Sequence, residues 1–270
     1  MMEVVVYGIF IFILGLCLGS FFNVVGYRLP NNMSIVYPPS HCPNCNHRLS
    51  AIELIPILSY IVQGGKCKNC KSKISIMYPI FELLTGVLFL ICYLIFRDTF
   101  PSTLNIVFSC LFISLLIIII ISDIKYMIIP DEVLIFFGVV LIILKTYITY
   151  IQNPTYTFMQ MGYEVIFTFI DGLMMFLIMY LIRLFGNITF KKDSMGGGDI
   201  KMMGVIGMII GWKLSVVVLF LSAFIALPLS IYNMYKNKEH MLAFGPYLSI
   251  ATIILYLSKI DIETIINFLI

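Results

Sequence analysis

Long apolar runs alternate with short polar segments along the chain. Three of these runs contain no Asp, Glu, Lys or Arg: residues 4–27, 99–122 and 214–235. Each has at least 22 residues, and about 20 are enough to cross a hydrocarbon core. The whole pattern predicts eight membrane segments, roughly at 4–26, 79–96, 102–122, 129–150, 162–185, 200–211, 213–235 and 244–260. The sixth is short and is either a partial span or a bend continuous with the seventh.

Composition supports an all-α polytopic membrane protein with about eight transmembrane helices. The 270 residues are 61% hydrophobic and 11% charged, against about 45–50% and about 25% in soluble domains. No basic region precedes the first apolar run, and the run is too long for a cleaved signal peptide. A net charge of +3 is too small to suggest a nucleic acid partner. The apolar composition instead predicts that membrane lipid surrounds the chain.

The distribution of Lys and Arg predicts the orientation. The first loop carries six of these residues, whereas the loops near 97–101, 151–161 and 212–213 carry only Arg97 and Lys213. Because cytoplasmic loops are enriched in Lys and Arg, we expect the N-terminus outside and the first loop in the cytoplasm. Asp123, Asp131 and Asp199 then all lie at the cytoplasmic face.

The first loop, residues 28–78, contains two C-x-x-C pairs. Cys42 and Cys45 are separated from Cys67 and Cys70 by 21 intervening residues. This spacing predicts a four-cysteine zinc site, and four thiolates leave no open position, so the metal would be structural. Unliganded thiols and a redox role remain open alternatives. His41 and His47 flank the first pair and are expected to be solvated loop residues.

Two acidic clusters point to chemistry. Asp123 ends the third segment, where a carboxylate is disfavoured by the helix dipole, so some other requirement is expected there. Asp131 follows Pro130 at the start of the fourth segment and has a sufficient structural explanation as a residue of a first helical turn. Asp199 follows Gly196, Gly197 and Gly198 where the sixth segment begins. In the simplest alternative, Asp199 is a satisfied helix cap in a short connector.

Asp123 and Asp199 are 76 residues apart but lie at one predicted depth of the bundle. If two carboxylates meet within a few ångströms, they share a proton near working pH. One can then act as general base on a water while the other polarises a scissile carbonyl. This arrangement needs neither metal nor histidine, and none of the three histidines lies in a predicted membrane segment.

The remaining polar residues have open interpretations. Lys201 could lower the pKa of Asp199 or anchor the helix at lipid phosphates. Glu82 either faces a substrate or caps a helix, and Asn23 either bonds a neighbouring helix or supports a second site. Asp171, well inside the fifth segment, is expected to face the bundle interior and to have a partner.

The chain resembles the type IV prepilin peptidases, which are membrane aspartic proteases of the GxGD type. The motifs that carry the resemblance occur in order along nearly the whole chain. They are Gly19 to Val25, Arg28-Leu29-Pro30, the two cysteine pairs, Ile55-Pro56, Ser59-Tyr60, Gly64 to Cys67, Tyr78-Pro79 with Glu82, Asp123 with Ile129-Pro130-Asp131, Gly196 to Lys201, and Phe244 to Tyr247.

The resemblance implies cleavage of the basic leader of prepilins or pseudopilins, after a glycine, at the cytoplasmic face of a bacterial inner membrane. It implies Asp123 and Asp199 as the catalytic pair, supported by Gly196, Gly197, Gly198, Lys201 and Asp131. It also implies N-methylation of the new terminal residue with S-adenosylmethionine, with Glu82, Asn23 and Arg28 as possible substrate or methylation residues. The expected division is a first transmembrane helix at 1–27, a zinc loop with the methyltransferase region at 28–78, and a peptidase bundle at 79–270.

Two other functions remain as alternatives. A proton- or ion-coupled transporter would use buried carboxylates as its relay, and Asp171 is the one acidic residue clearly near a segment midplane. A membrane thiol oxidoreductase would use the C-x-x-C pairs, but these would then have to lie on the oxidising side, against the charge asymmetry.

Overall fold

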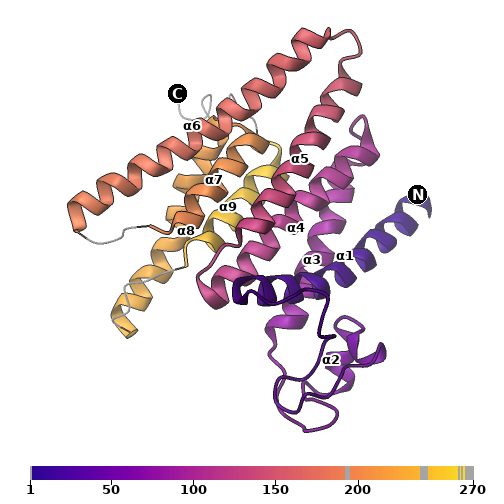
Figure 1. Ribbon diagram of the computed structural model, residues 1–270. Helices are drawn as coiled ribbons and strands as arrows, with labels where there is room; N and C mark the ends of the chain where they lie inside the picture. Colours follow the sequence, from indigo (N-terminus) through magenta and orange to yellow (C-terminus); the bar gives the residue numbers. More distant parts are fainter. Residues whose placement is uncertain (1, 192–194, 238–242, 261, 263, 265–270) are drawn as a thin grey trace. The chain divides into compact units, whose positions relative to one another are not determined.

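The structure is a computed structural model in which residues 2–191, 195–237, 243–260, 262 and 264 are described. Helices make up the regular structure of this part of the chain, as Figure 1 shows. The described residues contain no strand, only two isolated antiparallel bridges, His41–Arg48 and Lys66–Lys73. The all-α class predicted from the hydrophobic pattern is confirmed.

Eight helices of the described residues correspond to the eight predicted membrane segments. They are α1 (Met2–Arg28), α3 (Met77–Phe96), α4 (Ser102–Tyr126), α5 (Asp131–Gln152), α6 (Phe158–Phe190), α7 (Gly197–Ile210), α8 (Trp212–Asn237) and α9 (Gly245–Ser258). Short turns lie in the first loop: η1 (Leu29–Asn31), η2 (Ile52–Leu54) and α2 (Leu58–Val62).

Six of these helices are long and apolar enough to cross a membrane: α1, α3, α4, α5, α6 and α8. Helices α7 and α9 have only 14 residues each. The structure also settles the form of the sixth segment. Gly211, with φ +85°, ends α7, and α8 begins at Trp212. A positive φ is not helical, and glycine adopts it readily. Gly211 therefore interrupts the helix, so α7 is a separate short helix and not a continuation of α8.

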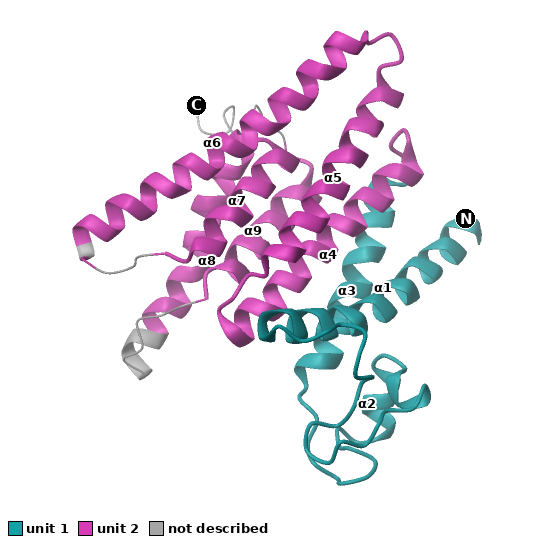
Figure 2. Ribbon diagram, viewed as in Figure 1, with its two compact units in different colours: residues 1–97 teal, residues 98–270 magenta. Residues whose placement is uncertain are grey.

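The chain forms two compact units, residues 1–97 and 98–270, which Figure 2 colours separately. In the first unit α1 packs on α3, and the cysteine loop lies between them in sequence. The two helices approach closely, since a Cβ on Gly19 would lie 2.9 Å from Cα of Glu82. Contacts thus group α3 with α1, whereas the expected functional division places residues 79–97 with the peptidase bundle. That division stays a prediction.

Helix α4 forms the core of the second unit. Every residue from Phe112 to Asp123 is buried, and α4 packs against both α5 and α9. A helix that is apolar on all sides is expected at the centre of a bundle. Helix α7 packs against α6, α8 and α5, so it is also an interior element.

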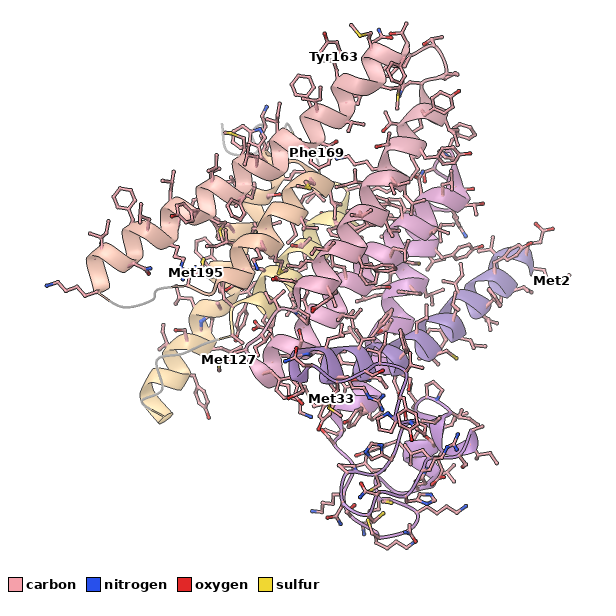
Figure 3. All side chains as sticks on the ribbon, viewed as in Figure 1. Met2, Met33, Met127, Tyr163, Phe169 and Met195 are labelled. Atoms are coloured by element: carbon pink, nitrogen blue, oxygen red, sulfur yellow. The ribbon has the colours of Figure 1, made fainter. Side chains whose placement is uncertain are left out.

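One end of the second unit gathers the polar residues singled out in the sequence. Helices α4 and α6 end there, and α5, α7 and α9 begin there (Figure 1). In Figure 3, Met127 and Met195 mark the α4–α5 turn and the start of the α7 segment at this end, and Tyr163 marks the opposite end. Asp123, Asp131 and Asp199 therefore share one end of the helix bundle.

Candidate active site

Asp123 is held by the first residue of another helix. Its side chain lies near the end of α4 and the residue is 5% exposed. The backbone N–H of Gly245, which begins α9, donates a hydrogen bond of 2.9 Å to Asp123 Oδ2. A Cβ on Gly245 would lie only 2.7 Å from the same oxygen. Position 245 therefore has to be glycine for the amide to approach the carboxylate this closely.

Asp199 lies in the first turn of α7, whose N-cap is Gly196. The residue is 8% exposed, and its Oδ1 is buried with no hydrogen-bond partner in the described part of the chain. The alternative of a satisfied helix cap therefore does not hold for this oxygen. Asp199 lies outside the six long spans, and burial, together with the Asp123 carboxylate, raises the pKa of Asp199 to about 7.

Ile129 of the α4–α5 turn connects the two carboxylate-bearing regions. A Cβ on Gly198 would lie 3.0 Å from Ile129 Cβ, and a Cβ on Gly245 would lie 3.3 Å from Ile129 Cδ1. One side chain thus contacts the starts of both α7 and α9. Because Asp123 and Asp199 also interact electrostatically, the arrangement suits a pair of acids that shares one proton.

Lys201 binds Asp131. Its Nζ donates to Oδ1 and Oδ2 of Asp131 at 2.8 and 2.6 Å, and both side chains are about half exposed. Asp131 is the first residue of α5, as the sequence predicts. The bond joins the start of α5 to the first turns of α7, next to Asp199. Sequence reasoning did not suggest this pairing.

Sequence reasoning also missed the contacts of two residues at this end. Gly245 was noted as part of a turn motif, without a role for its amide. Arg183 of α6 has no place among the predicted site residues, but its Nη1 lies 3.5 Å from the position of a Cβ on Gly197. A glycine directly before a proline at a helix start was the available signal for Gly245; nothing in the local pattern pointed to Arg183.

The four loop cysteines converge in the first unit. All four Sγ atoms lie within 4.8 Å of one another. The Cys42–Cys70 and Cys45–Cys67 sulfur pairs are 3.8 and 3.9 Å apart. A tetrahedral ZnS₄ site with Zn–S of about 2.3 Å has sulfur–sulfur edges of about 3.8 Å. The cluster fits a four-coordinate metal ion.

The backbone forms two equivalent knuckles around these cysteines. Cys42 N–H donates to His47 O and Cys67 N–H donates to Ser72 O, both at 2.9 Å. The Ser72 hydroxyl and backbone N–H stabilise the Cys70 thiolate and lower its pKa to about 5. A thiolate at neutral pH is the form that binds metal.

The two loop histidines lie outside the sulfur cluster, as expected. Each has a partner, however. His41 Nδ1 lies 2.9 Å from Pro39 O, and His47 Nε2 lies 3.3 Å from Glu53 Oε2. Both histidines are partly exposed, so they are loop residues in contact with solvent that also have a polar partner.

Three further predicted site residues are buried in the first unit. Glu82 Oε2 accepts a 2.8 Å hydrogen bond from the N–H of Ile57. Asn23 Nδ2 donates to the carbonyls of Gly19 and Tyr78, at 3.2 and 3.3 Å. Arg28 Nη1 donates to Ser34 O at 2.9 Å. These contacts tie α1 and α3 to the ends of the cysteine loop.

Comparison with known proteins gives the family. The Bacterial Peptidase A24 N-terminal domain model matches residues 13–96, which hold the cysteines, and the Type IV leader peptidase family model matches residues 110–231, which hold both buried aspartates. No solved structure matches the chain.

Similar proteins are named prepilin leader peptidase/N-methyltransferase. The one from Bacillus subtilis is 36% identical, with 92% of each chain covered. Those from Vibrio cholerae and Pseudomonas aeruginosa are 32% and 29% identical, covering 82% and 88% of this chain and 84% and 86% of the relative. None of these names supports a transporter or a thiol oxidoreductase. The chain belongs to the type IV leader peptidase family.

Proposed function

We propose that this chain is a membrane aspartic endopeptidase that removes the basic leader of type IV prepilins or pseudopilins. Membership of the family supports the reaction class. The observation that carries the proposal is the buried pair Asp123 and Asp199, in which one oxygen of Asp199 has no hydrogen-bond partner among the described residues. An unpaired buried carboxyl oxygen is costly unless a substrate or a water binds it.

The contacts favour different roles for the two acids. Asp123 accepts the Gly245 amide, and such a bond favours a charged carboxylate. Asp199 Oδ1 has no such donor, and burial together with the Asp123 charge raises the Asp199 pKa to about 7. In the resting pair, Asp199 therefore holds the shared proton and Asp123 is ionised.

The reaction then follows from these protonation states. Asp123 takes a proton from a water molecule, and the oxygen of this water attacks the scissile carbonyl carbon. At the same time Asp199 gives its proton to the carbonyl oxygen. The tetrahedral product collapses as Asp123 passes its proton to the departing amine and the diol returns a proton to Asp199. The C–N bond breaks, and the pair regains one shared proton.

The glycines before Asp199 have a proposed role in substrate binding. Residues 196–198 form the N-cap and first residues of α7 and carry no side chains that would cover the Asp199 carboxyl. An extended substrate backbone can thus lie against this turn, and its carbonyl groups can accept hydrogen bonds from the first N–H groups of the helix, which have no intrahelical acceptor. The ion pair of Lys201 with Asp131 joins the first turns of α7 to the start of α5.

The charge distribution supports a cytoplasmic position for this end of the bundle. The loops after the odd-numbered segments carry most of the Lys and Arg residues, which places them inside by the positive-inside rule. A bacterial inner membrane with the N-terminus outside satisfies this distribution. The basic leader of a prepilin would then meet Asp123 and Asp199 on the cytoplasmic side, with cleavage after a glycine.

N-methylation of the new terminal residue is the proposed second activity. The relatives carry N-methyltransferase in their names. S-adenosylmethionine supplies the methyl group when it is bound. Glu82, Asn23 and Arg28 are buried groups of the first unit, and a carboxylate, an amide and a guanidinium suit a methyl donor that carries both a sulfonium and an amino acid group. Cys42, Cys45, Cys67 and Cys70 would hold one structural zinc ion in the loop of the same unit.

Mass spectrometry of a prepilin co-expressed with the chain tests both activities. The wild type should yield a product that begins after the leader glycine and carries one methyl group. Asp123→Asn and Asp199→Asn should each abolish cleavage, because each removes one titrating member of the pair. Normal processing by either variant would refute the peptidase proposal, and a cleaved product without the methyl group would refute the second activity.

A further inference from the structure

The C-terminal end of α7 lies where a helix needs outside partners. At about 1.5 Å per residue, the 14 residues of α7 rise about 21 Å, less than the roughly 30 Å of a hydrocarbon core. A helix that starts at one face therefore ends within the apolar layer. The last carbonyls of a helix lack intrahelical donors, and lipid offers none.

Lys145 of α5 supplies these donors. Its Nζ donates to the carbonyl of Met208 at 2.6 Å and to that of Ile209 at 3.1 Å. Lys145 lies well inside α5, one of the six long apolar spans. A positive charge there is costly unless it is paired, and the negative end of the α7 dipole is a suitable partner.

Asp171 of α6 lies at the same end of α7. Its Oδ2 is 3.7 Å from the position of a Cβ on Gly211, the residue that terminates α7. Asp171 and Glu164 are the carboxylates that act electrostatically on Lys145. The sequence predicts that Asp171, inside α6, needs a partner. In the structure Asp171 lies beside the end of α7 and interacts electrostatically with Lys145, a residue that belongs to no sequence motif.

Three of the contacts between α5 and α7 are spaced along both helices. The contacts run in parallel order: Asp131 with Lys201, then Gly138 beside Val205, then Lys145 with Met208 and Ile209. The first contact is an exposed ion pair, and the last is partly buried. A short helix held at both ends is fixed against sliding and rotation, and Asp199 is fixed with it.

From these contacts we propose that Lys145 is a positioning residue that caps the C-terminal end of α7 and so sets the place of Asp199, with Asp171 as the nearby counter-charge of Lys145. This inference rests on the proposed peptidase function for its kinetic consequence. Its structural consequence, a stabilised end of α7, is independent of that function.

The test uses the full-length chain in detergent micelles. Lys145→Met removes the charge and the donors at similar length, and Lys145→Arg keeps both. Because a misplacement of about 1 Å can reduce a rate about a hundredfold, we expect Lys145→Met to lower kcat for leader cleavage by about tenfold to a hundredfold with KM unchanged. Lys145→Arg should restore most of the rate. Lys213→Met, an exposed lysine just beyond α7, is the matched control and should cleave as the wild type does.

Hydrogen exchange provides a second measurement that needs no activity. In Lys145→Met the amides of residues 208–211 should exchange faster than in the wild type, while those of α4 should not change, which also shows that the variant is folded. If Lys145→Met has the kcat and the exchange rates of the wild type, the positioning role of Lys145 is refuted, and the peptidase proposal is not affected. Equal loss in Lys145→Arg and Lys145→Met also overturns it, since packing rather than capping would then be responsible. A wild type that does not cleave prepilin overturns the peptidase proposal and leaves the exchange test in force.

Discussion

Substitution of Gly245 by alanine tests the link between α9 and Asp123. The added Cβ would lie 2.7 Å from Asp123 Oδ2 and 3.3 Å from both Asp123 Cγ and Ile129 Cδ1. An ordinary van der Waals contact begins at 3.4 Å, so the carboxylate oxygen at 2.7 Å has to move by about 0.7 Å, and its bond to the amide lengthens with it. Since a displacement of about 1 Å can reduce a rate about a hundredfold, we expect kcat to fall by about tenfold to a hundredfold, or about 1.4–2.7 kcal/mol of transition-state stabilisation.

The assay is leader cleavage of a purified prepilin by the full chain in detergent, with kcat and KM determined separately. KM should change little, because the carboxylate acts on the transition state rather than on leader binding. Gly204→Ala is the matched control: it adds the same methyl group in α7, where the nearest atoms are at 3.5 Å or more. If Gly245→Ala cleaves as fast as Gly204→Ala, the amide contact does not position Asp123 and the proposed division of roles is wrong.

Three further predictions follow from the same contacts. With an Asp199 pKa of about 7 and a mechanism that needs this group protonated, kcat should fall as the pH rises through about 7; a rate that increases over that range contradicts the assignment. Asp131→Asn breaks an exposed ion pair of the kind worth about 0–1 kcal/mol, so kcat should fall less than about fivefold, far less than in Asp199→Asn. Elemental analysis of the purified chain should find one zinc ion per chain and none in Cys42→Ser; equal zinc in both would exclude the four-cysteine site.

The helices were predictable because membrane-length apolar runs dominate the sequence. Run length alone places α3, α4 and α5 to within a few residues. The short α7 was harder to define, since its apolar run continues into α8 and only Gly211 separates the two. The cysteine cluster was also predictable, because the two C-x-x-C pairs form local knuckles that need only be brought together once.

The partners of the site residues were not predictable in the same way. Hydrophobic periodicity says that a helix is buried, but not which helix lies beside it. The contacts of Asp123 with Gly245 and of Lys201 with Asp131 join residues 122 and 70 positions apart. Lys145, alone in an apolar run, has the pattern of an interface lysine, and its role depends on where α7 ends. Such pairings depend on the packing of whole helices, which no local pattern encodes.

The placement of Asp123 shows how the packing resolves an unfavourable local feature. At the C-terminal end of α4, the helix dipole opposes a negative charge, and nothing nearby in the sequence compensates. In the structure, the N-terminus of α9 supplies an amide donor to this carboxylate, and Asp199 lies in the first turn of α7. Two positive helix ends therefore face the acids where one negative end opposes them. These helix ends stabilise a negative charge on the pair, and burial of Asp199 together with repulsion from Asp123 limits the pair to one charge. A pair with one proton is the state that the proposed hydrolysis requires.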